Sequence, residues 1–434
     1  MQATHQGFIC LVVSALLIAS QPARADGASD TPHAFGDWGG NRSRLEDEGI
    51  TFDFGYDSQV GHNFSGGTAH LTRYADQWRL GATLDLEKLW SWKGASFKVL
   101  MTDRHGRDVG LDAHIGNNQS VQDVYGRGQT LHLSVFALEQ KFLDGRIDWR
   151  IGRLPVGVDF ASFSCDFQNL TFCGAQPGNI VGDYWINTPT SQWATRLKFD
   201  TGHDTYVQVG AYQVNPKYID DAYARRNGWK LDFPSGTTGV LVPVEFGWKP
   251  SLGGLPGSYK VGGWHNSSPG DDLFLDRNGQ PLAITGGMPL QHDSRRGAYI
   301  VAKQQLSGEA GGGGLSVFFR ASQADRATSA TDRQLAAGIE YKGPFGRADD
   351  TIGFAIGATR ANGYAAHYQR LYNQLHTDHV VVQDGSETAA ALFYGFSPVA
   401  GVTLRPNLQY VRRPGGSREN SNALVLGLDT SITF

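Results

Sequence analysis

Few residue strings in this chain have the types and spacing that catalysis requires. His265, Asn266, Ser267 and Ser268 follow one another, and a serine beside a histidine and a polar orienting group is the set used in nucleophilic hydrolysis, including by some barrel lipases. Both serines directly precede the turn dipeptide at 269–270, which indicates the end of a strand. We therefore predict no catalytic residues and keep a barrel lipase as the weakest alternative.

Other motif-like strings also fail on their context. The Asp-Phe-Gly at 53–55 lies inside an alternating strand pattern and upstream of 105–108, so the order of kinase motifs is wrong. The four glycines at 311–314 lack the Lys-Ser/Thr of a phosphate loop. The string at 276–279 offers only a fragment of a calcium loop and is better explained as an Asn-Gly turn. We predict no metal site and no cofactor.

The informative polar residues instead occupy alternate positions between apolar ones. Arg79 lies between Trp78 and Leu80, and Arg196 precedes Leu197, so the two sets of side chains point to opposite faces of a strand. Candidate residues for a polar inner face are Asp53, Arg79, Lys98, Asp148, Arg150, Gln192, Arg196, Lys198, Glu245, Trp264, Arg320 and Arg405. Basic and acidic groups are mixed, with amides and a flat ring among them. This lining suits a neutral polyhydroxylated solute better than a strongly selected ion.

The elements that would position these residues are strands. Period-two alternation begins at Ile50 and recurs about sixteen times to the end of the chain, where 422–434 places Leu424, Leu426 and Phe434 on one face. The facing is ambiguous at 207–213 and 299–305. By itself the last segment is equally compatible with a soluble edge strand or with the closing strand of an outer-membrane barrel, whose terminal aromatic lies at the membrane interface.

The connections favour the barrel. Short connections such as 143–146 and 200–204 alternate strictly with long ones such as 103–128 and 154–191. Outer-membrane barrels have short periplasmic turns and long extracellular loops, whereas a sandwich has no reason to segregate loop length. We predict an all-β transmembrane barrel of about sixteen antiparallel strands over 50–434, with both termini periplasmic.

The first residues read as an export signal. An apolar run at 8–18 is followed by the small-x-small pattern 23–25, which predicts cleavage after Ala25 of a signal peptide at 1–25. Residues 26–49 are expected to form a periplasmic segment with one short helix around 42–48. Cys165 and Cys173 are the remaining cysteines, and in an oxidising compartment we expect them to be bridged.

Composition excludes other classes. A net charge of -4 over 434 residues, without a basic run, argues against nucleic-acid binding. Gly 56 and aromatics at 11% fit a large β-protein. The mean hydropathy of -0.33 argues against a helical membrane protein but not against a barrel, because only alternate residues of each strand meet lipid.

The chain also resembles the carbohydrate-selective porin family. The resemblance covers nearly the whole mature chain, and its most specific part is the cysteine-bounded segment 165–174. The other matching stretches are Trp38-Gly39-Gly40, 45–49, 192–197, 210–216, 243–248, 262–269, 276–287, 406–411 and the terminal Phe434. The segment around His376 and His379 is distinctive.

The resemblance implies a sixteen-stranded barrel that passes sugars passively and is narrowed by inward-folded loops and a lining of Arg and Glu. By position, Arg79, Arg150, Arg196 and Glu245 are the best candidates for that constriction. The implied partners are small neutral sugars, outer-membrane lipid and, through Phe434, the barrel assembly machinery; a homo-oligomer is left open. A general or anion-preferring porin is the alternative function.

Overall fold

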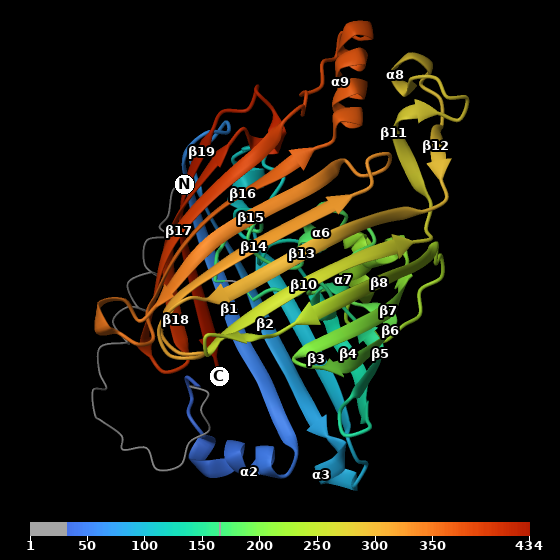
Figure 1. Ribbon diagram of the computed structural model, residues 1–434. Helices are drawn as coiled ribbons and strands as arrows, with labels where there is room; N and C mark the ends of the chain where they lie inside the picture. The colour runs from blue at the N-terminus through green and yellow to red at the C-terminus, as the bar shows by residue number, and fades with distance from the viewer. Residues whose placement is uncertain (1–32, 165) are drawn as a thin grey trace, which may run out of the picture.

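The chain folds into a closed antiparallel β-barrel (Figure 1). The computed structural model describes residues 33–164 and 166–434. Its 17-stranded sheet comprises sixteen barrel strands and the two-residue β9 (Ser251–Leu252), which extends one hairpin. The predicted strand number is confirmed. The barrel strands are β1 (Ile50–Ser65), β2 (Thr72–Asp85), β3 (Ala95–Gly106), β4 (Leu131–Phe142), β5 (Ile147–Leu154), β6 (Gln192–Gly202), β7 (Thr205–Val214), β8 (Gly239–Trp248), β10 (Leu255–Asn266), β13 (Arg295–Gln305), β14 (Gly314–Ala324), β15 (Thr331–Lys342), β16 (Thr351–Ala361), β17 (Ser386–Val399), β18 (Val402–Arg412) and β19 (Ala423–Thr433).

The barrel closes where its first and last strands meet. β19 pairs antiparallel with β1, with Tyr56 opposite Ile432 and Val60 opposite Leu428. This pairing joins the two edge strands of the barrel sheet to each other. The terminal residue is held as well, because the Phe434 ring stacks on Phe35 at 5.1 Å between centroids and on Trp78 at 5.9 Å.

Side-chain alternation resolves the two strands whose facing the sequence left open. In β7, Val207 is exposed on the outer wall while Gln208 and Tyr212 are buried inside. In β13, Ile300 is exposed outside while Tyr299 and Val301 are buried inside.

Within residues 33–164 and 166–434, the helices lie in the connections between strands and ahead of β1. The short-turn end carries α2 (Asn41–Asp47), α3 (Leu86–Trp90), η1 (Trp38–Gly40) and η3 (Pro344–Gly346). The long-loop end carries α4 (Val109–Asp112), α5 (Val156–Asp159), α6 (Gln176–Ile180), η2 (Pro216–Ile219), α7 (Asp221–Asn227), α8 (Leu282–Thr285), α9 (Gly363–Leu375) and η4 (Pro414–Gly416), with the hairpin β11 (Gly270–Asp276) and β12 (Pro289–His292). The N-terminal helix expected around 42–48 corresponds to α2, whereas α9 and the hairpin were not expected. Among the described residues, no helix is long and apolar enough to cross a membrane.

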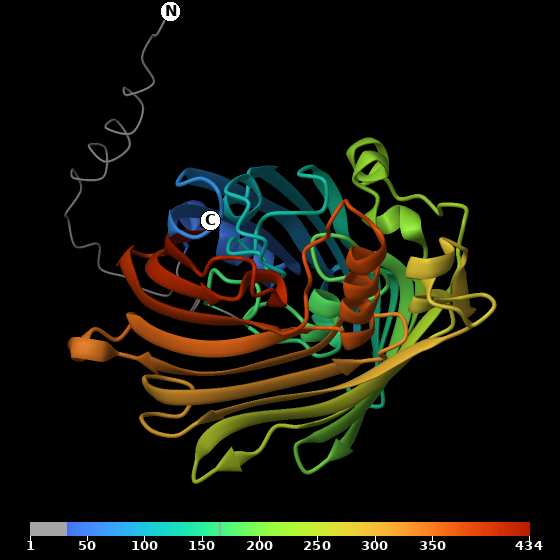
Figure 2. The ribbon, with the colours of Figure 1, turned by 90° about the horizontal axis from the view of Figure 1, so that it is seen from above.

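A hydrophobic core lies inside the barrel, between the wall and the segments seen within the ring of strands in Figure 2. Two long loops, 107–130 and 155–191, fold into the lumen. Phe160, Tyr184 and Trp185 of the second loop pack against Tyr212 and Tyr299 of the wall. The loops therefore replace open channel with packed protein and leave restricted polar passages.

Candidate functional site: the polar lumen

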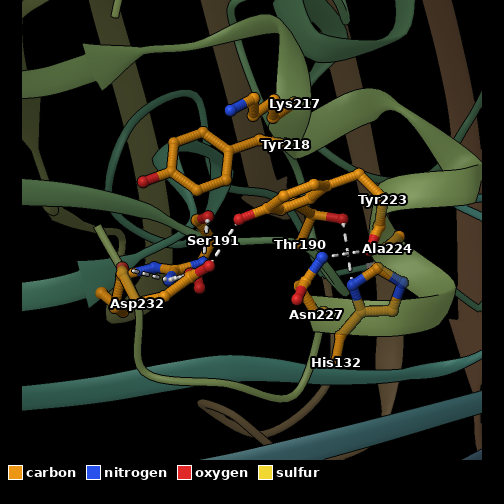
Figure 3. Close-up of a pocket in the computed structure, with 11 residues that line it drawn as sticks. His132, Thr190, Ser191, Lys217, Tyr218, Tyr223, Ala224, Asn227 and Asp232 are labelled. Atoms are coloured by element: carbon orange, nitrogen blue, oxygen red, sulfur yellow. Dashed lines mark hydrogen bonds and ion pairs between the residues drawn. The ribbon is translucent and has the colours of Figure 1, made fainter. Parts of the chain in front are cut away.

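The pocket at the rim between β4, β5 and the loop 215–238 is almost filled by its own side chains (Figure 3). It is lined by His132, Arg153, Tyr218, Tyr223 and Asp232, among others, and leaves only about 10 Å³ of open space. That is about the room for a single water molecule. The site for a larger solute must be sought in the lumen.

A polar cavity of about 380 Å³ opens where the two inward loops meet the wall. Asp57, Gln59 and Gln77 come from β1 and β2, because alternate residues of these strands face inward. Arg104, Arg405, Asp429 and Ser431 come from β3, β18 and β19, while Asp123, Val124, Asp166, Phe167 and Thr188 come from the loops. The cavity thus lies between the fixed wall and the loops that narrow the channel.

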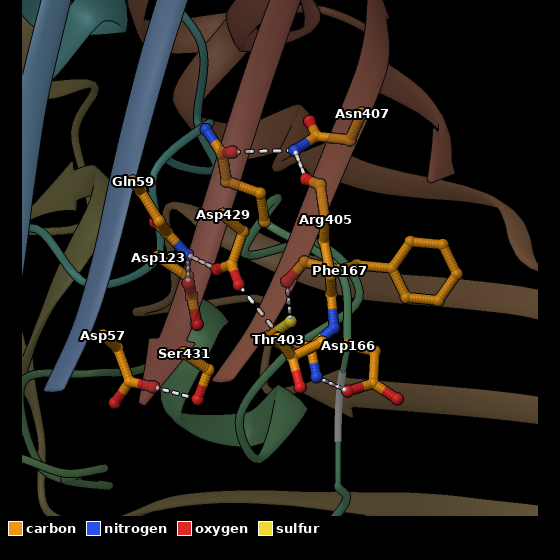
Figure 4. A network of polar contacts seen from close by, with 12 residues as sticks. Asp57, Gln59, Asp123, Asp166, Phe167, Thr403, Arg405, Asn407, Asp429 and Ser431 are labelled. Atoms are coloured by element: carbon orange, nitrogen blue, oxygen red, sulfur yellow. Dashed lines mark hydrogen bonds and ion pairs between the residues drawn. The ribbon is translucent and has the colours of Figure 1, made fainter. Parts of the chain in front are cut away.

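Amide and guanidinium groups connect the acids of this cavity (Figure 4). Gln59 Nε2 donates to Asp429 Oδ2 at 2.8 Å and also to Asp123. Arg405 donates to Asp429 at 3.1 Å and to Asp166 at 2.7 Å. One arginine therefore joins the wall to the cysteine-containing loop.

Asp123 has an altered acidity. Its carboxyl group is surrounded by the loop and the wall, although part of it reaches the lumen. This burial raises the pKa of Asp123 to about 7, and the negative charge of the nearby Asp429 also raises it. The charge at this point of the channel therefore changes near neutral pH.

The most accessible of the predicted residues form a second group on β1, β2 and β3. Arg79 Nε lies 3.2 Å from Asp57 and its NH1 lies 3.7 Å from Asp53, while Lys98 Nζ lies 3.2 Å from Asp53. The side chains of Arg79 and Asp53 are each 33% exposed, and that of Lys98 is 41% exposed. These groups present paired donors and acceptors to the open lumen.

A third group pairs wall arginines with the inward loop. Arg150 donates to Asp159 at 2.8 Å and also pairs with Glu139. Arg196 lies 3.1 Å from Asp148 and 3.5 Å from Asp159. Because the Arg196 side chain is only 2% exposed, it acts within the wall rather than on the open channel.

Four predicted residues lie beneath the loop 155–191. Glu245, Arg320 and Gln192 are each 0% exposed, and Trp264 is 4% exposed. Arg320 donates to the carbonyl oxygens of Phe172 and Gly174, and Gln192 donates to the carbonyl oxygen of Tyr184 at 3.2 Å. Trp264 donates to the Tyr184 hydroxyl at 3.0 Å. These side chains hold the loop.

Lys198 stands apart from the other predicted residues. Its ammonium lies 4.3 Å from the ring centre of Tyr206, and within the described chain no carboxylate lies within 4.0 Å of it. It lines a separate polar cavity of about 350 Å³ toward the short turns, together with Lys141 and Lys249.

The predicted bridge falls partly outside the described residues. Cys173 is disulfide-bonded and buried, but Cys165 lies outside the described residues, so the pairing stays a prediction. The signal sequence and its cleavage after Ala25 also lie outside them.

The lining residues predicted from the sequence did not include Gln59, Arg104, Asp123 or Asp429, although Gln59 and Asp429 lie within alternating strands. Asp123 lies in a loop without periodicity, so no pattern marks it. Arg104 lies near the end of β3, beyond the clear alternation at 96–102.

A closed sixteen-stranded barrel with short turns at one end, long loops at the other and a narrowed polar lumen defines an outer-membrane porin. The family model for the carbohydrate-selective porins, OprB family, matches residues 69–434, and the chain belongs to this family.

Individual relatives agree with this assignment. The chain is 40% identical to Porin B of Pseudomonas aeruginosa over 416 residues, which cover 92% of this chain and 90% of that protein. It is 32% identical to the putative porin QuiX of Acinetobacter baylyi, with 98% of each chain covered. The high-pH structure of Pseudomonas putida OprB superposes with a TM-score of 0.89 at 40% identity, covering 94% of this chain and all of that one.

Proposed function

We propose that this porin passes small neutral sugars, of monosaccharide size, by passive diffusion into the periplasm. The observation that supports this most directly is the mixed lining of the accessible lumen, in which Arg79, Lys98 and Asp53 offer donors and acceptors side by side. A sugar hydroxyl both donates and accepts hydrogen bonds. It can therefore replace its hydrogen bonds to water with hydrogen bonds to a neighbouring donor and acceptor of the wall, although the sugar carries no net charge.

The proposal assigns two roles to the predicted residues. The sugar contacts the solvent-accessible residues Asp53, Arg79 and Lys98 and the residues that line the cavity around Arg405. The buried Gln192, Glu245, Trp264 and Arg320 fix the loop that narrows the passage.

A planar-bilayer measurement tests this proposal. Glucose should reduce the ion current of the wild type in a concentration-dependent manner, and Arg79→Ala should weaken that block. Lys93→Ala, a change of an exposed base in the turn after α3, is the matched control and should leave the block unchanged. If glucose does not block while phosphate does, sugar selectivity is the wrong assignment.

A second candidate is anion-preferring diffusion. Lys198 and Lys260 lie on the lumen wall without a carboxylate within 4.0 Å among the described residues, which favours a passing anion at that point. Measuring the block of the ion current by phosphate as well as by glucose in the planar bilayer distinguishes sugar-selective from anion-preferring diffusion.

The family and fold make this protein a channel, and we propose that it has no hydrolytic activity. His265 is exposed on the outer wall, whereas Ser268 is buried and its hydroxyl accepts hydrogen bonds from Arg295 and Asn266. A lipase assay on the wild type and His265→Ala checks this. Recognition of Phe434 by the assembly machinery and a homo-oligomeric state remain predictions.

A further inference from the structure

One extracellular loop folds outward instead of into the lumen. On β5 and β6, Arg153 is the cross-strand partner of Trp193, and Gln192, the residue before Trp193, points inward to the carbonyl of Tyr184. Arg153 and Trp193 therefore share the outer face. The loop 215–238 covers them.

Direct contacts fix this position. Trp193 Nε1 donates to the carbonyl oxygen of Asp232 at 2.7 Å, and its ring lies 6.2 Å from that of Phe233. The Arg153 guanidinium lies 4.9 Å from the ring centre of Tyr218 and 3.7 Å from the Asp232 carboxylate. Seen from above, α7 lies at the outer edge of the ring of strands (Figure 2). Because β5 ends at Leu154 and β6 begins at Gln192, this is the rim that carries the long loops, which in outer-membrane barrels is the extracellular end, next to the outer leaflet.

The surface of this outward loop carries two kinds of exposed groups. Trp229, Leu231 and Phe233 are 52%, 49% and 70% exposed. Arg226 and Lys230 are exposed beside them, and within the described chain neither has a carboxylate within 4.0 Å. Asp232, which lies between Leu231 and Phe233, is engaged by Arg153 and Tyr223.

We propose that the loop 215–238 binds a phosphorylated lipid of the outer leaflet, with Arg226 and Lys230 on the phosphate and Trp229 and Phe233 against the acyl region. Aromatic side chains favour the membrane interface, and basic side chains next to it attract anionic headgroups. This surface is separate from the lumen, so lipid binding is independent of sugar passage.

Charge favours lipid over a second copy of the chain. The chain has a net charge of -4, but this loop presents Arg226 and Lys230, which have no ion-pair partner among the described residues, beside exposed apolar groups. An interface between identical copies would bring these bases toward one another around the symmetry axis, and like charges there disfavour association. A phosphate neutralises them.

Native mass spectrometry of the detergent-solubilised full chain, titrated with diphosphorylated lipid A or with phosphatidylcholine, tests the proposal. The test variant is Arg226→Gln with Lys230→Gln. The matched control is Arg277→Gln with Arg418→Gln, which removes two exposed bases from other extracellular loops. Each base near an anionic headgroup contributes about 1 kcal/mol, so the test variant should need roughly thirtyfold more lipid A for half-saturation. The control should match the wild type.

Equal lipid A binding by the two double variants, or equal binding of lipid A and phosphatidylcholine by the wild type, would overturn the proposal. A change of oligomeric mass in the test variant with lipid binding unchanged would show that the surface joins subunits, and would also overturn it. Glucose block of the current, measured on the same preparations, should be the same in all variants.

Discussion

Glu245 is the residue whose replacement should open the channel most clearly. Its carboxylate is fully buried and accepts four hydrogen bonds: from the Tyr206 hydroxyl at 2.7 Å, the Gln208 amide at 2.9 Å, the Tyr299 hydroxyl at 2.8 Å and the Ala161 backbone N–H at 2.8 Å. The first three donors lie on the barrel wall, and the fourth lies on the inward loop. Glu245→Ala should therefore release the loop at Ala161 while the barrel stays closed.

The size of the effect on loop release depends on the hydrogen-bond donors that lose their acceptor when the Glu245 carboxylate is removed. Hydroxyl and amide side chains can turn toward water entering the vacated space, but the Ala161 N–H is fixed by the backbone. A buried donor without a partner costs about 1–3 kcal/mol, so the equilibrium for releasing this part of the loop should shift by roughly 5- to 150-fold. Glu245→Gln keeps an acceptor oxygen at this position and should show a smaller effect.

Single-channel recording in a planar bilayer measures this shift. We expect Glu245→Ala to give larger or frequently switching conductance and weaker glucose block than the wild type, with Glu245→Gln between them. Heat-modifiable migration on a gel checks that each barrel is closed. Wild-type conductance and glucose block in a correctly closed Glu245→Ala protein would refute the idea that this carboxylate holds the constriction.

Three further outcomes are expected. Burial raises the pKa of Asp123 to about 7, so raising the pH from about 6 to about 8 should ionise its carboxyl group. The reversal potential measured in a KCl gradient should then shift toward cation preference. An unshifted potential, or the same shift in Asp123→Asn, would contradict this. Cys165→Ser with Cys173→Ser should increase current noise but leave the heat-resistant migration of the barrel on a gel intact. The bridge would close a loop of about nine residues and contribute only about 2.5 kcal/mol to the stability of the fold. Loss of that migration would show that the bridge holds the barrel. Arg79→Ala should raise ion conductance without impairing membrane insertion, since its side chain is partly open to the lumen, and unchanged conductance would place the filter in the loops alone.

The fold could be predicted from the sequence because a barrel strand has two different environments. Lipid outside and polar lumen inside impose period-two alternation, as Arg79 shows between the exposed Trp78 and Leu80. The alternation of short and long connections then predicts which end of the barrel is extracellular, because the long loops lie at that end. Strands with apolar groups on both faces, such as β13 with Tyr299 and Ile300, stayed ambiguous because the inward loop gives their inner face an apolar environment as well.

The functional site could be predicted only in part. Alternation identifies which residues face inward, but it does not say which of them the folded loops then cover. Glu245 and Arg320 have the same inward facing as Arg79, yet they are fully buried because the loop 155–191 packs on their side of the barrel. Loop residues such as Asp123 carry no periodic signal at all.

Liposome swelling tests the central claim most directly. Purified protein should be reconstituted and exposed to equal osmolarities of glucose, a disaccharide and phenylalanine, a zwitterionic solute close to glucose in size. We expect glucose to enter much faster than either of the others. Equal rates for glucose and phenylalanine would contradict carbohydrate selectivity and would show a channel that sorts solutes by size alone.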